Sequence, residues 1–163
     1  VYVDGTDIYT KNKTELAIFR RRQIGLIYQF YILVPTLDGM GNITLPLKLD
    51  GRKVNRPYLE ELLKTLRLED RVDHLPSQLS GGQQQRAAIG RALINAPALL
   101  LADEPTGNLD AKNSQEIIQL LRTSNQKYKQ TLIVITHDEN MALQAGRIIR
   151  LSDGRLVSDE KVG

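Results

Sequence analysis

Hydrophobic residues along this chain form short apolar runs separated by longer, mixed segments. Three runs are apolar almost throughout, without a regular alternation of polar residues: 24–28 (IGLIY), 98–102 (ALLLA) and 131–136 (TLIVIT). Uninterrupted apolar runs of this length are typical of strands that are buried on both faces of a parallel sheet. We therefore predict three such strands.

The segments between these runs read mainly as helices. Residues 58–68 carry apolar side chains at 59, 62, 63 and 66, which is the spacing of an amphipathic helix. Four further helices are predicted, at residues 14–22, 82–95, 111–124 and 140–145. The prolines and glycines within 30–57 predict irregular structure there.

Two Asp-Gly pairs predict β-hairpins at the two ends of the chain. Asp4-Gly5 lies between the segments 1–3 and 6–9, and Asp153-Gly154 lies between 147–151 and 155–157. The alternation of strands and helices between these hairpins predicts an α/β fold, with a parallel sheet covered by helices.

Composition limits the functional classes. The chain has 163 residues, of which 41% are hydrophobic and 25% charged, as in soluble globular domains. The net charge is only +3 and the basic residues are dispersed apart from Arg20-Arg21-Arg22, which we interpret as a solvated helix end, so nucleic acid is not an expected partner. The absence of cysteine excludes disulfides and thiolate metal sites. Because Val1 begins inside a predicted strand, we expect the chain to be a fragment.

Polar residues follow each predicted strand. Gln29 ends the first, Asp103 and Glu104 end the second, and His137 ends the third. If the strands are parallel neighbours, these side chains converge at one edge of the sheet, where α/β folds place ligands. Two carboxylates and a histidine suit phosphoryl transfer, in which one carboxylate orients Mg²⁺ and another polarises the attacking water.

A glycine-containing turn precedes the second strand. Gly81 and Gly82 allow backbone conformations that are closed to other residues, and a helix begins directly after them. Free N–H groups and the positive end of the helix dipole would favour a phosphate at this point.

These residues resemble the motifs of ATP-binding-cassette (ABC) ATPases. LSGGQ at 79–83 resembles the signature motif, and LLLADEP at 99–105 resembles the Walker B strand with its catalytic glutamate. Asn108-Leu109-Asp110 resembles the D-loop, while Gln29 and His137 resemble the Q-loop and H-loop residues. The segments QFYILVPTL and ADEPTGNLD are similar to those of the family branch that acts in lipoprotein release, macrolide export and antimicrobial-peptide resistance.

The resemblance implies a fold and a ligand. It implies a partial RecA-like P-loop NTPase core at 1–29 and 96–163, with a C-terminal hairpin, and an inserted α-helical subdomain at 30–95. The implied cofactors are ATP and Mg²⁺.

Individual roles follow from the same resemblance. Asp103 would hold Mg²⁺ through water, Glu104 would be the general base, and His137 would contact the γ-phosphate. Gln29 would bind Mg²⁺ or the water. The remaining motif residues would face the nucleotide of an opposite subunit or link the two sites: Ser80, Gly81, Gly82, Gln83 and Asp110.

The implied partners are a transmembrane permease subunit and a second ATPase subunit in a homodimer. The implied location is the cytoplasmic face of the cell membrane, as a peripheral subunit, and the implied work is transport of a peptide, lipoprotein or drug-like substrate. Gly41 and Ile32 stand where this branch commonly has Glu and Asn, which affects the expected permease contacts.

One family motif is absent. The 163 residues contain no G-x-x-x-x-G-K-[ST], so they lack a P-loop, which the family places upstream of Val1. We expect these residues alone to be inactive as an ATPase. The alternative is a non-hydrolytic interaction module that presents its signature face to an intact cassette. A soluble cassette of ribosomes or DNA repair is a third reading, but its tandem cassettes or long coiled-coil insertions are absent here.

Overall fold

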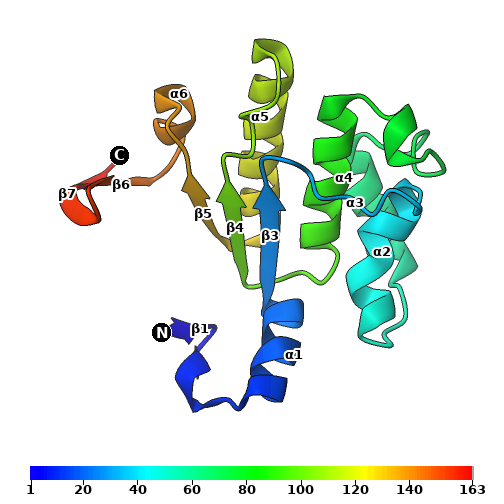
Figure 1. Ribbon diagram of the computed structural model, residues 1–163, viewed down its shortest axis with the longest axis horizontal. Coiled ribbons are helices and arrows are strands. Elements are labelled where there is room, and N and C mark those ends of the chain that lie inside the picture. The colour runs from blue at the N-terminus through cyan, green and yellow to red at the C-terminus, as the bar shows by residue number, and fades with distance from the viewer. Residues whose placement is uncertain (163) are drawn as a thin grey trace.

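The computed structural model describes residues 1–162 and arranges them around a three-stranded sheet (Figure 1). The last residue of the predicted core segment, Gly163, lies outside the described residues. The strands are β1 (Tyr2–Val3), β2 (Thr6–Asp7), β3 (Ile24–Tyr28), β4 (Leu99–Asp103), β5 (Thr131–Ile135), β6 (Arg147–Ser152) and β7 (Arg155–Lys161). The α-helices are α1 (Lys13–Gln23), α2 (Gly39–Leu49), α3 (Arg56–Leu66), α4 (Gly81–Leu93), α5 (Ala111–Tyr128) and α6 (Glu139–Ala142). Two 3₁₀ turns, η1 (Ile8–Thr10) and η2 (Pro76–Gln78), complete the described elements.

The central sheet is parallel and has the order β3-β4-β5. Its register aligns Tyr28 with Asp103 and Asp103 with Ile135, so the three strands end at the same level. The predicted α/β class and the predicted parallel strands are therefore confirmed. The polar residues that follow the strands all leave the sheet at one edge.

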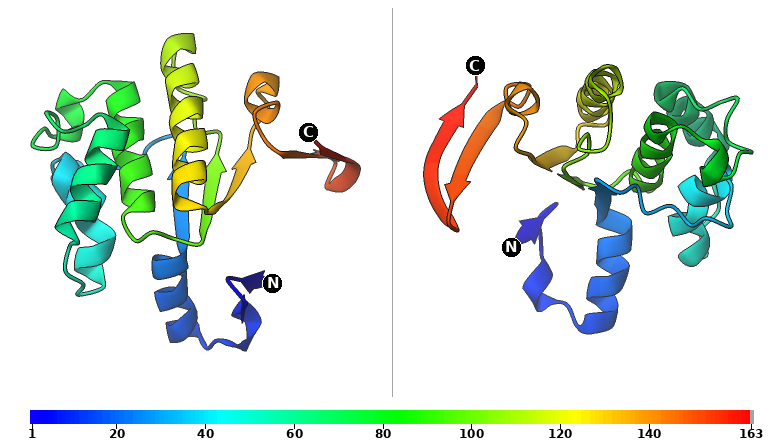
Figure 2. Two further views of the ribbon diagram at one scale, coloured as in Figure 1. Left: turned by 180° about the vertical axis from the view of Figure 1, so that it is seen from behind. Right: turned by 45° about the horizontal axis from the view of Figure 1, so that its top comes forward.

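Helices α4 and α5 cover one face of this sheet (Figure 2). Gly25 lets α4 approach β3 closely, because a Cβ at this position would lie 2.6 Å from the carbonyl oxygen of Ala92. Leu100 of β4 packs in one cluster with Leu93 of α4 and Ile117 of α5, and each is at most 1% exposed. This layer between helices and sheet forms the hydrophobic core next to the site.

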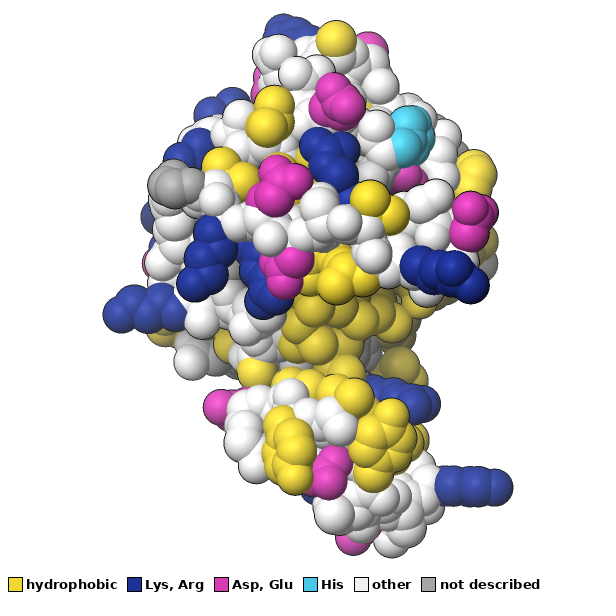
Figure 3. Space-filling view, turned by 90° about the vertical axis from the view of Figure 1, so that its left-hand side faces the viewer, with side chains coloured by type: hydrophobic (Ala, Val, Ile, Leu, Met, Phe, Trp, Pro, Cys, Tyr) yellow, Lys and Arg dark blue, Asp and Glu magenta, His cyan; other side chains and the backbone are white. Residues whose placement is uncertain are grey.

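The other face of the sheet is bare among the described residues, which corrects the prediction of strands buried on both faces. Burial alternates along β3, and Leu26 and Tyr28 remain 44% and 37% exposed. Ile133 and Ile135 of β5 are 50% and 64% exposed. Hydrophobic side chains gather in the middle of one side of the molecule, above the protruding N-terminal segment (Figure 3). The apolar sequence pattern reflects this uncovered face as well as the core.

Helix α2 is a second correction, because residues 30–57 were predicted to be irregular. The Asp38 side chain caps the helix by accepting a hydrogen bond from the Gly41 amide at 2.6 Å. Ile43 and Leu47 lie on one side of the helix and are buried in the core cluster. Pro46 is accommodated within the helix, where its ring removes one backbone donor. The apolar residues of this segment follow a helical spacing, but its prolines and glycines, which are unfavourable in helices, favoured the prediction of irregular structure.

The basic end of α1 is solvated as interpreted, with Arg20, Arg21 and Arg22 all exposed, but two of these arginines also bind residues at the end of α2. Arg22 Nε donates to Asp50 Oδ2 at 2.7 Å, and Arg21 Nη1 donates to the Leu49 carbonyl at 3.0 Å. These bonds hold the pKa of Asp50 below its usual range, with the Arg22 hydrogen bond as the largest cause. They attach the C-terminal end of α2 to the helix that leads into β3.

The two hairpins match their predicted turns. Asp4 and Gly5 both have positive φ angles, of 48° and 71°, as the tight turn between β1 and β2 requires. Asp153 and Gly154 do the same between β6 and β7, with φ angles of 49° and 73°. No helix among residues 1–162 is both long enough and apolar enough to cross a membrane.

Candidate functional site

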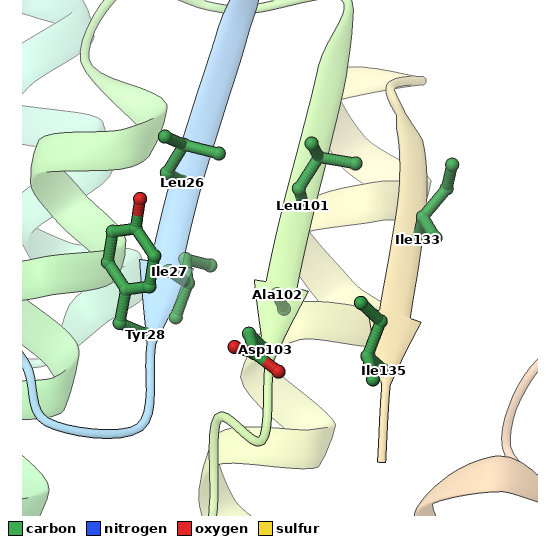
Figure 4. Close-up of a pocket in the computed structure, with 8 residues that line it drawn as sticks. All are labelled: Leu26, Ile27, Tyr28, Leu101, Ala102, Asp103, Ile133 and Ile135. Carbon is green, nitrogen blue, oxygen red and sulfur yellow. The ribbon is translucent and has the colours of Figure 1, made fainter.

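The three parallel strands end side by side, with Asp103 at the end of the middle strand and apolar side chains of the bare face around it (Figure 4). Asp103 lies at the end of β4, between Tyr28 of β3 and Ile135 of β5, where it borders a shallow pocket of about 200 Å³. The Asp103 side chain is exposed and no protein hydrogen bond holds it in the described residues. Its carboxylate is therefore available to a ligand at the strand ends.

Glu104 is held in a fixed orientation at this edge. Its φ angle of 43° is in the left-handed region, which costs energy for a residue with a side chain, and its amide N–H donates to the Ile135 carbonyl at 2.9 Å. The carboxylate accepts hydrogen bonds from the His137 amide at 2.9 Å and from the Thr136 hydroxyl at 3.2 Å. A further hydrogen bond of 2.7 Å joins Glu104 Oε1 to His137 Nδ1. The predicted pair of Glu104 and His137 is thus in direct contact.

Gln29 is placed at the same edge, where its hydrogen bonds among the described residues go to Asn108 and not to Glu104. Its Nε2 lies 3.4 Å from Asn108 Oδ1, and its carbonyl accepts a hydrogen bond from Asn108 Nδ2 at 3.0 Å. Gly107 must lack a side chain, because a Cβ there would lie 2.5 Å from Gln29 Nε2. The loop after β3 and the loop after β4 are therefore joined through the Gln29–Asn108 pair.

The signature-like turn forms the start of α4. Ser80 caps the helix: its hydroxyl accepts from the Gln83 amide at 3.3 Å, and Gln83 Oε1 accepts from the Ser80 amide at 2.9 Å. Gly81 and Gly82 belong to the helix and have no positive φ, so their predicted conformational role is wrong. Both glycines instead lie close to neighbouring side chains, which a Cβ would displace. A Cβ at Gly82 would lie 2.6 Å from Asn113 Oδ1.

Asp110 caps α5 and connects it to this turn. Its carboxylate accepts hydrogen bonds from the Asn113 backbone amide at 2.8 Å and from Asn113 Nδ2 at 2.7 Å. These two bonds are the main reason that the pKa of Asp110 is lowered. Because the Asn113 oxygen lies against Gly82, the structure brings Asp110 and the signature-like turn together through one intermediate side chain.

The donor set fits a hard cation that is only partly held by protein. No group of three or more His, Asp or Glu side chains in residues 1–162 is arranged as a metal cage. Mg²⁺ beside phosphates commonly uses one or two carboxylates and takes its remaining ligands from water and the nucleotide. The single exposed carboxylate of Asp103, with the amide of Gln29 on the neighbouring strand, is compatible with that mode.

Comparison with known proteins identifies the family. A model of the ABC transporter family matches residues 1–107, and relatives more than 40% identical match nearly the whole chain. The chain belongs to the ABC transporter ATPase family.

The ABC relatives fall in the branch that the sequence motifs indicate. The chain is 41% identical to the lipoprotein-releasing system ATP-binding protein LolD 1 of Chlorobium chlorochromatii, over 99% of this chain and 67% of the relative. It is 45% identical to the macrolide export ATP-binding/permease protein MacB of Rhodopirellula baltica, over 97% of this chain. It spans only 24% of that longer relative.

Solved structures of an ATP-binding cassette have the same fold as this chain. The ATP-binding cassette MJ0796, in a dimeric post-hydrolysis state bound to ADP and Pi, superposes with a TM-score of 0.85 at 41% identity. The match covers 99% of this chain and 72% of MJ0796. A second dimeric structure of MJ0796 matches with the same TM-score.

At the ABC site, Thr136 and Asn113 had no role in the sequence-based prediction, and Asn108 entered it only as part of the D-loop resemblance. Thr136 holds the Glu104 carboxylate, Asn108 holds Gln29, and Asn113 links Asp110 to Gly82. Each is a small polar residue within five positions of a predicted site residue, and this nearness in sequence is the feature by which it could have been found. Sequence alone did not distinguish them from ordinary loop and helix-cap residues.

Proposed function

We propose that this chain is the ATP-binding subunit, or part of it, of a transporter that couples ATP binding and hydrolysis to the movement of a lipoprotein, peptide or drug-like substrate. The observation that carries the proposal is the contact between Glu104 and His137 at the strand edge that also presents Asp103. The lipoprotein and drug-like classes are taken from the names of the relatives, which are lipoprotein-releasing and macrolide export proteins, and the peptide class is taken from the sequence resemblance.

The roles proposed at this edge are those that the resemblance implies, and the contacts are compatible with them. Asp103, exposed and without a protein partner, would orient Mg²⁺ through water. Glu104 would accept the proton of the attacking water, and His137 would stabilise charge at the γ-phosphate. Gln29 would complete the Mg²⁺ or water environment, since it lies at the end of the adjacent strand.

The signature turn would serve a second nucleotide. Ser80, Gly81, Gly82 and Gln83 lie at the N-terminus of α4, where free amides and the helix dipole favour an anion. In the proposed homodimer they would close over ATP held by the partner subunit, and Asp110 would link the two sites. Binding to a permease at the cytoplasmic face of the membrane is part of the same proposal.

The missing P-loop sets a limit on these 163 residues. Because no G-x-x-x-x-G-K-[ST] cradle is present, we expect no measurable ATP binding at micromolar concentrations by calorimetry on the chain as given. Micromolar affinity would contradict this expectation. If the chain is instead a non-hydrolytic module, it should bind an intact cassette through its signature face without turnover.

The test is ATP hydrolysis by a cassette in which a P-loop segment of this family precedes Val1. Glu104→Gln should abolish steady-state turnover while an ATP-bound dimer accumulates in light scattering. The matched control is Glu60→Gln, which makes the same chemical change at an exposed position of α3, away from the strand ends. Unchanged turnover in Glu104→Gln would refute the role of this residue.

A further inference from the structure

Gln85 of α4 is a fully buried amide that reaches the ends of two strands. It is 0% exposed. Its Nε2 lies 2.6 Å from the Pro105 carbonyl, directly after Glu104, and 3.4 Å from the Tyr28 carbonyl, directly before Gln29. One side chain of the signature helix thus touches both loops that carry the proposed catalytic groups.

A second contact holds the Gln29 loop from its other side. Arg91, also on α4, donates to the Ile32 carbonyl at 2.6 Å and to the Tyr31 carbonyl at 3.0 Å. Both Tyr31 and Ile32 have positive φ angles, of 52° and 47°, so this loop has a strained shape that needs outside support. Gln29 is therefore bracketed by attachments from the same helix.

The start of α4 touches this loop as well. A Cβ at Gly81 would lie 2.9 Å from the Tyr31 hydroxyl, so the signature turn and the loop are in contact. Burial of the Tyr31 side chain raises the pKa of its phenol. The loop after β3 is thus attached along the length of α4.

From these contacts, we propose that Gln85 is a positioning residue that makes Gln29 and Glu104 move together with the signature helix. Its importance for catalysis rests on the proposed ATPase function. In that setting α4 carries the turn that closes over one nucleotide, and Gln85 connects this helix to the groups that act on another. A displacement of α4 would then reach both loops through Gln85, with Arg91 as a second attachment to the Gln29 loop.

Packing alone does not explain an amide at this position. Gln85 Oε1 is buried and has no hydrogen-bond partner among the described residues, which is an energetic cost that a leucine or methionine would avoid. On the following turn of α4, Ala88 and Ile89 are apolar and 0% exposed, while the adjacent Arg86 is a second buried polar side chain. An amide that carries this cost must contribute through its donor, which is the group that reaches the two carbonyls.

The experiment uses amide hydrogen exchange and NMR on the 163-residue chain, and needs no nucleotide. In Gln85→Met, which keeps the side-chain length and removes the donor, the Glu104 and Gly107 amides should exchange about tenfold faster than in the parent chain. The side-chain amide resonances of Gln29 and Asn108 should shift in the same variant. The matched control is Ile89→Val, which loosens the same helix but touches neither carbonyl and should leave these signals in place.

Effects in Gln85→Met that are no larger than those in Ile89→Val would overturn the proposal. If Gln85→Met does not fold, the parent chain still decides. A scalar coupling across the hydrogen bond from Gln85 Nε2 to the Pro105 carbonyl, with slowed exchange of the Gln85 side-chain protons, is expected, and its absence would also overturn the proposal. Because this experiment does not use ATP, its result does not depend on whether the proposed ATPase function is correct, and the two proposals can fail independently.

Discussion

Replacing Gly25 with alanine tests whether α4 packs on β3 as closely as the structure indicates. A Cβ at this position would lie 2.6 Å from both the Ala92 carbonyl oxygen and Leu100 Cδ1, and 3.2 Å from the Ala92 carbonyl carbon. Leu100 can move its side chain, but the carbonyl belongs to the backbone of α4. The helix must therefore shift away from the sheet in Gly25→Ala.

The expected cost follows from two opposing effects. Overpacking in a core typically costs about 1–3 kcal/mol, and a contact with backbone belongs near the upper end of that range. Replacing glycine restricts the unfolded chain and returns about 0.4–1 kcal/mol. We therefore expect Gly25→Ala to lower the free energy of unfolding by about 2 kcal/mol.

Urea denaturation followed by circular dichroism measures this change. For an m-value of about 2 kcal/mol/M, the midpoint should fall by about 1 M. The control is Gly146→Ala, because a Cβ at Gly146 meets no atom within 4 Å and the glycine has no positive φ. A midpoint in Gly25→Ala that is equal to or higher than that of the parent chain would refute the packing of α4 on β3.

Three further changes probe other parts of the chain. Asp50→Asn removes a carboxylate whose pKa is lowered mainly by the hydrogen bond from Arg22. A carboxylate with a lowered pKa stabilises the fold at pH values above its unfolded pKa of about 3.9, so the parent chain should lose stability as the pH falls below this value. In melting experiments at different pH values, Asp50→Asn should lose less stability over the same range. Arg86→Met leaves the Leu66 carbonyl without its buried donor and removes the bond to Glu116, so the free energy of unfolding should fall by about 2 kcal/mol in thermal or urea denaturation. An unchanged free energy of unfolding would contradict a stabilising role for these two bonds. Ile135→Lys places a charge on the bare sheet face, where the isoleucine is 64% exposed, and should reduce concentration-dependent self-association in light scattering without lowering the melting temperature.

Sequence reasoning located the strands and most helices because their patterns are local. The apolar runs predicted β3, β4 and β5, and the Asp-Gly pairs predicted both hairpin turns. Helix α2 was missed, since Gly39, Gly41 and Pro46 are unfavourable in a helix and only packing against α4 compensates for them.

At the candidate site, too, the features that depend on local sequence could be predicted and those that depend on tertiary contacts could not. The convergence of Asp103, Glu104 and His137 could be predicted, because parallel strands bring their C-terminal ends to one edge. The roles of Gln85 and Asn113 could not, since each acts across a tertiary contact that has no sequence spacing. The same holds for the signature glycines, which lie against neighbouring side chains and have no positive φ angle.

The central claim is that Glu104 and the signature turn of one chain serve different nucleotides. It is tested by mixing two variants of the P-loop-completed cassette, Glu104→Gln and Ser80→Arg, each inactive alone, and measuring single-turnover ATP hydrolysis. In the mixed dimer both defects fall in one composite site and the other site is intact, so hydrolysis should return on mixing. If the mixture stays as inactive as the separate variants while light scattering shows that they dimerise, Glu104 and Ser80 act at the same nucleotide, which would refute the assignment to two nucleotides.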